Sequence, residues 1–76
     1  MKTGSDLKMA LRDAVNYSFV GCADARETFL IAQSVIEFFC AIGLSDEEYV
    51  EILSNCGGSD AETDDAIDRL IEEFKQ

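Results

Sequence analysis

A chain of 76 residues with 16 acidic and 6 basic side chains carries a formal charge of −10, which disfavours direct binding to nucleic acid or to an anionic membrane. The length leaves room for one domain, residues 1–76, and a chain this small buries only roughly 60% of its unfolded surface. Hydrophobic residues make up 47% of the sequence, so we expect a folded core rather than disorder.

The first helix is expected over residues 5–20, with Ser5 or Asp6 as its N-cap and Gly21 at its end, because apolar residues recur there with a helical period. Some apolar side chains of this segment do not fit its buried stripe. We expect them to fold over the core, the alternative being an apolar spot on the surface. They are Met9, Tyr17, Phe19 and Val20.

The second helix is expected to be central and largely buried. Asp24 and Glu27 have the spacing of a capping box, and Gly43 is expected to stop the helix. Between them the apolar arc is wider than a surface helix needs, which indicates contacts on several sides. Cys40 lies on this arc and is expected in the core. Gln33, Ser34 and Glu37 interrupt the run, which is too short to cross a bilayer.

Two capping boxes predict two more helices. Ser45 with Glu48 opens a third helix that ends at Cys56, and Leu44 with Tyr49 forms a hydrophobic staple across its start. Ser59 with Glu62 opens a fourth helix that runs to about residue 74. The connections are short and no alternating strand pattern occurs, so the predicted fold is an all-α, compact four-helix bundle.

The chain offers little for catalysis or for a cofactor. It has no histidine, and hence no ordinary general base poised near neutral pH and no imidazole ligand for a metal. Asp60, Glu62 and Asp64 alternate as in a calcium-binding EF-hand, but Asp65 and Ile71 occupy the positions that need glycine and a bidentate acid. We therefore expect no enzyme, no metal and no cofactor.

The cysteines at positions 22, 40 and 56 lack metal-binding spacing, and an odd number cannot all pair, so we expect reduced thiols. Cys22 alone could be reactive, because it precedes the second helix, whose dipole lowers a thiol pKa. The N-terminal sequence MKTGSDLKM has no apolar segment after its first lysine, so we expect no secretory signal and a cytoplasmic protein.

The negative charge is concentrated in the second half of the sequence. Five acids face four bases up to residue 44, whereas eleven acids face only two bases from residue 45 onward. Asp64, Asp68 and Glu72 follow one another at i, i+4 spacing, and such like charges repel. This pattern either keeps a small protein soluble or forms a surface for a basic partner. The candidate partner-binding residues are Glu47, Glu48, Glu51, Asp64, Asp65, Asp68, Glu72 and Glu73.

In size, charge and lack of catalytic groups the chain resembles the small acidic inhibitors carried by phages, such as anti-CRISPR and anti-restriction proteins. The resemblance rests on composition over the whole chain, without a diagnostic motif. It implies a non-enzymatic nucleic-acid mimic that blocks a basic, nucleic-acid-binding site on a partner protein. The alternative is a helical interaction module or homodimer that acts through an apolar patch formed by Leu30 and Ala41 with Met9, Phe19 and Val20. An acyl-carrier protein is disfavoured, because Ala25, Arg26 and Glu27 stand where its attachment motif would lie.

Overall fold

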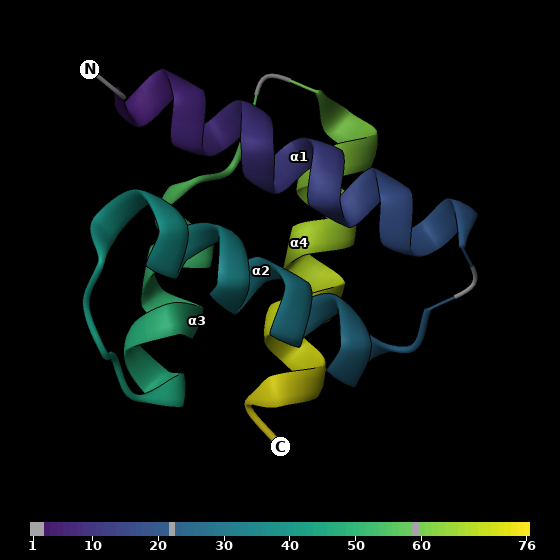
Figure 1. The fold of residues 1–76 in the computed structure, drawn as a ribbon. Helices are drawn as coiled ribbons and strands as arrows, with labels where there is room; N and C mark the ends of the chain where they lie inside the picture. The colour runs from purple at the N-terminus through teal and green to yellow at the C-terminus, as the bar shows by residue number, and fades with distance from the viewer. Residues whose placement is uncertain (1–2, 22, 59) are drawn as a thin grey trace.

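The computed structural model describes residues 3–21, 23–58 and 60–76, and it confirms the all-α four-helix prediction (Figure 1). In chain order the helices are α1 (Gly4–Val20), α2 (Ala25–Cys40), α3 (Asp46–Asn55) and α4 (Ala61–Phe74). Helix α1 packs along α2, and α4 contacts all three other helices (Figure 1). None of the helices, over the described residues, combines the length and apolar character needed to cross a bilayer.

The N-terminal caps explain where the helices begin. Asp24 accepts a hydrogen bond from the Glu27 N–H at 2.8 Å, and Ser45 forms the expected capping box with Glu48. Helix α1 is capped by Thr3 rather than by Ser5 or Asp6, because the Thr3 hydroxyl accepts from the Asp6 N–H at 3.3 Å and the Asp6 carboxylate accepts from the Thr3 N–H at 2.9 Å. The cap predicted at Ser5 or Asp6 is therefore wrong.

The start of α4 and the end of α2 also differ from the prediction. Asp60 is the N-cap of α4, and its carboxylate accepts from the Glu62 N–H at 3.0 Å, whereas Ser59 lies outside the described residues. Helix α2 ends at Cys40, because Ala41 adopts a left-handed conformation with φ 54° and donates its N–H to Glu37 O at 2.7 Å. The stop predicted at Gly43 is therefore wrong.

The core draws on all four helices. Phe29 lies near its centre, with its ring stacked on Phe74 at 4.0 Å and edge-on to Tyr49 at 6.3 Å between ring centroids. The Tyr49 hydroxyl donates to the Glu37 carboxylate at 2.8 Å, which satisfies the polar end of this buried ring. The buried apolar residues are Leu11, Val15, Phe29, Ala32, Ile36, Tyr49, Leu53, Ile67, Leu70 and Ile71.

Helix α2 is covered on one side only, so the prediction of a largely buried second helix is wrong for its outer side. Leu30 keeps 50% and Phe38 70% of its surface exposed, and Cys40 is exposed rather than part of the core. Three other helices supply too little surface to enclose the whole apolar arc. The α1 residues expected to fold over the core are likewise on the surface; they are Met9, Tyr17, Phe19 and Val20.

Candidate partner-binding site

Helix α4 brings part of the predicted acidic set together on one surface. Asp65, Asp68, Glu72 and Glu73 are exposed, and with Arg69 they line an open depression of about 500 Å³. Their spacing places them on the side of the helix away from its buried stripe. We call Asp65, Asp68, Glu72 and Glu73 the α4 acidic strip.

Asp64 was expected on the same surface but has a structural contact instead. It is only partly exposed, and its carboxylate accepts a hydrogen bond from the Gly58 N–H in the connection between α3 and α4. A Cβ atom added at Gly57 would lie 3.3 Å from Asp64 Oδ1, so the backbone approaches this carboxylate closely. Asp64 thus holds the α3–α4 connection and does not line the depression.

The three predicted residues of α3 lie apart from the strip. Glu47 and Glu51 are exposed and do not line the α4 depression. The Glu48 carboxylate accepts from the N–H and the hydroxyl of Ser45, each at 3.1 Å, so it caps its own helix. Of the eight predicted residues, four gather and two serve local structure.

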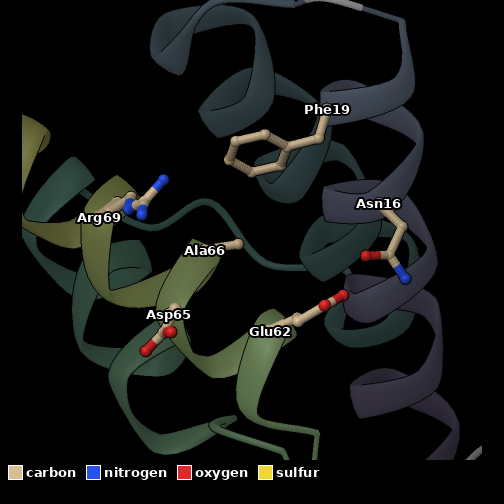
Figure 2. A pocket seen from close by; sticks show the side chains of 6 residues that line it. All are labelled: Asn16, Phe19, Glu62, Asp65, Ala66 and Arg69. Atoms are coloured by element: carbon tan, nitrogen blue, oxygen red, sulfur yellow. The ribbon is translucent and has the colours of Figure 1, made fainter.

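A groove between α1 and α4 adjoins the acidic strip and was not predicted. It has a volume of about 280 Å³ and shares Asp65 and Arg69 with the strip. Figure 2 shows the Phe19 ring reaching over Ala66 and the Arg69 guanidinium directed away from the Asp65 carboxylate. The strip therefore borders an aromatic side chain that is 53% exposed.

The acidic side of this groove is completed by Glu62, whose carboxylate points toward Asn16 on α1 (Figure 2). A second hollow of about 250 Å³ continues past Phe19 and Arg69 as far as Glu73. The sequence signal for Phe19 was its position outside the buried stripe of α1. Nothing in the sequence indicated that α4 would lie opposite it.

A different surface between α1 and α2 is apolar. A shallow hollow of about 430 Å³ is lined almost entirely by carbon, from Ala10 on α1 to Val35 and Phe38 on α2. Leu30 and Ala41, which were expected in an apolar patch, are exposed but do not line it. This hollow is the feature of the structure that suits the alternative interaction module.

The thiols differ in their surroundings. Burial raises the pKa of Cys56, while the nearby Lys8 charge acts in the opposite direction. Cys40 is exposed, and Cys22 lies outside the described residues. Over residues 3–21, 23–58 and 60–76, no group of three or more acids or cysteines is placed to hold a metal ion.

Comparison with known proteins found no matching family model, no similar curated protein and no similar solved structure.

Proposed function

We propose that this chain is a non-enzymatic protein that binds a basic, nucleic-acid-binding site on a partner protein and blocks it, as anti-CRISPR-like inhibitors do. The observation that carries the proposal is the α4 acidic strip, four carboxylates on one open surface beside the exposed Phe19 ring. The strip is a narrower surface than the full set of eight acids that the sequence suggests.

The physical basis is charge complementarity with added contact to an aromatic ring. Asp65, Asp68 and Glu72 follow one another at about 4.5 and 6 Å along the helix axis, a spacing comparable to that of phosphates along a nucleic-acid strand. Lysines and arginines that normally contact a nucleic-acid backbone would meet a similar row of charges. An arginine is also suited to stack on Phe19, because its guanidinium is planar and favours aromatic faces.

Salt dependence tests the electrostatic part of the proposal. Capture of a host protein with the full chain as bait supplies the partner, and its affinity is then measured by calorimetry from low to high salt. The affinity should fall steeply as salt screens the charges. The captured partner should also lose its bound nucleic acid when this protein is added, as measured by fluorescence anisotropy.

A matched pair of double variants tests the location of the surface. Asp68→Asn/Glu72→Gln and Glu47→Gln/Glu51→Gln each remove two exposed charges at i, i+4 spacing, from α4 and α3 respectively. We expect the α4 variant to lose affinity at least about tenfold, or about 1.4 kcal/mol, and the α3 variant to lose less. Equal losses would assign the effect to net charge, and binding unchanged by either variant or by salt would refute the proposal.

The alternative function, an interaction module or homodimer, is favoured by the apolar hollow between α1 and α2. Binding through this surface should persist at high salt, because burial of apolar area does not depend on ion screening. Sedimentation equilibrium of the wild type and of Phe38→Ser decides this point. Salt-resistant self-association that Phe38→Ser abolishes would favour the homodimer.

A further inference from the structure

A further pocket, which shares no residue with the acidic strip, lies where α1 meets the N-terminal part of α4 and residues 56–58. It has a volume of about 250 Å³, and its polar lining comes from Ser5, Lys8, Arg12, Gly58 and Thr63. In Figure 1 the chain that leaves α3 passes behind α1 before α4 begins, and the lining residues show that these segments meet at the pocket. Met9, Cys56 and Ile67 supply the apolar remainder of the lining.

The charge of this pocket is opposite to that of the whole chain. Two of the 6 basic residues line it, although the chain has 16 acids, and no described carboxylate lines it. Lys8 and Arg12 stand one helical turn apart on the same side of α1, so their charges act on the same space. Within residues 3–21, 23–58 and 60–76, neither forms an ion pair with a carboxylate.

Thr63 provides an independent sign that a ligand belongs here. Its side chain lines the pocket and is only 2% exposed, and its buried hydroxyl has no hydrogen-bond partner among residues 3–21, 23–58 and 60–76. A buried hydroxyl without a partner costs free energy, and an isosteric apolar side chain would avoid that cost. A bound acceptor would satisfy the hydroxyl.

The N-terminus of the helix that carries Thr63 lies beside the pocket, and its cap and first turn also carry the carboxylates of Asp60, Glu62 and Asp64. Thr63 is the third residue of the 14-residue helix α4, where the helix dipole favours negative charge. Asp64 contacts the pocket wall through the Gly58 N–H but does not line the pocket. The pocket is therefore lined by two cations and by Ser5, with the buried Thr63 hydroxyl in its wall.

We propose that this pocket binds a phosphate group, with Lys8 and Arg12 balancing its charge and the Thr63 and Ser5 hydroxyls donating to its oxygens. A phosphate carries close to two negative charges at neutral pH and three acceptor oxygens, which match two cations and two hydroxyl donors. The pocket is smaller than the roughly 300–1,000 Å³ of sites for drug-sized molecules, so it suits a phosphate group better than a whole nucleotide.

Titration of inorganic phosphate into the full chain at constant ionic strength tests this proposal, with backbone amide shifts followed by NMR. We expect saturable shifts at Lys8, Gly58 and Thr63, and a rise in melting temperature as phosphate is added. Glycerol phosphate in a parallel titration separates a site for free phosphate from one for a phosphomonoester, according to which binds more tightly. Absence of saturable shifts with both probes would overturn the proposal.

Variants test the individual groups. Lys8→Gln and Arg12→Gln should each weaken phosphate binding at least about tenfold, while Arg26→Gln, which removes an exposed cation outside the pocket, should leave it unchanged. If Arg26→Gln weakened phosphate binding equally, the effect would come from the overall charge of the protein, and the proposed site would be refuted.

Thr63→Val distinguishes a ligand-binding role from a packing role. Because the buried hydroxyl has no partner in the part of the chain that the structure describes, the variant should melt at a higher temperature than the wild type without phosphate. The same variant should bind phosphate several-fold more weakly, so the stabilisation by phosphate shrinks. Phosphate affinity equal to that of the wild type would remove Thr63 from the site and refute the assignment.

Discussion

Helices α2 and α4 pack against the same core, but they separate polar from apolar residues very differently. Helix α4 buries Ile67, Leu70 and Ile71 and directs its acidic strip to solvent. Helix α2 buries Phe29, Ala32 and Ile36 on one side, yet on the other side Leu30 and Phe38 remain at least half exposed. Apolar residues are therefore a reliable guide to burial in α4 and a poor one in α2.

The difference follows from the amount of surface that a chain of 76 residues can supply. An amphipathic helix such as α4 needs one covered side, which its three neighbours provide. A helix with an apolar arc as wide as that of α2 would need cover on further sides, and no described segment lies over Leu30 or Phe38 closely enough to bury them. The width of the apolar arc thus indicates how much surface a helix could bury. The number of helices that pack against it determines how much surface it does bury.

Truncation on the two sides of α2 should show the largest contrast. Ile36 is fully buried, so Ile36→Ala should lower the free energy of unfolding by about 2–5 kcal/mol through lost apolar burial and a cavity. Leu30→Ala should cost less than about 1 kcal/mol, because half of that side chain is already in solvent. Urea denaturation measures both, and similar losses would mean that α2 is covered on both sides in solution.

A second contrast separates structural from surface carboxylates within α4. Asp64→Ala should cost about 1–2 kcal/mol, because it removes the acceptor for the Gly58 N–H. Asp68→Ala, one turn further along, should change stability by less than about 0.5 kcal/mol, because Asp68 is exposed on the acidic strip. Urea denaturation of the two variants under the same conditions provides the comparison. A larger loss of stability for Asp68→Ala than for Asp64→Ala would mean that Asp68 is the structural carboxylate and Asp64 the surface one.

The end of α2 offers a gain in stability. Ala41→Gly should raise the free energy of unfolding by about 1 kcal/mol, because Ala41 holds φ 54° and glycine adopts this region without a Cβ penalty. Gly43→Ala is the matched control: no described glycine has a positive φ, and a Cβ atom at Gly43 meets nothing within 4 Å. Thermal melts should therefore show stabilisation for Ala41→Gly and no loss for Gly43→Ala. Destabilisation by Gly43→Ala would indicate that Gly43, and not Ala41, ends α2.

The sequence predicts the four helices because helical period is a local property, but it identifies the N-caps of α2 and α3 only, and misses Thr3 and Asp60. The Ser45–Glu48 capping box and the Asp24 cap are contacts across three residues, so local spacing suffices to find them. Helical period also groups Asp68 with Glu72, but it adds Asp64 to them, which the structure places elsewhere. The groove at Phe19, the Asp64 contact with Gly58 and the exposure of Phe38 depend on how separate segments pack, which local spacing does not specify.

The smallest effect on the free energy of unfolding is expected from Tyr49, where α2 meets α3, and it appears only in alkaline solution. Burial, followed by the hydrogen bond to Glu37, raises the pKa of Tyr49 above its ordinary value of 10.0. The unfolded chain then loses the Tyr49 proton at a lower pH than the folded protein does. This contribution to stability is complete below the ordinary tyrosine pKa and is lost as pH rises through the folded-state pKa.

Tyr49→Phe should remove this part of the alkaline decline, so its free energy of unfolding should fall less steeply above about pH 10 than that of the wild type. Tyr17→Phe is the matched control, because Tyr17 is exposed on α1 and should leave the wild-type slope unchanged. Urea denaturation at intervals from neutral to strongly alkaline pH measures the three slopes. The free energy of unfolding of Tyr49→Phe could also fall as steeply with pH as that of the wild type. That result would mean that the Tyr49 phenol is as accessible to water in the folded protein as in the unfolded chain, and that the contact between α2 and α3 is open to solvent.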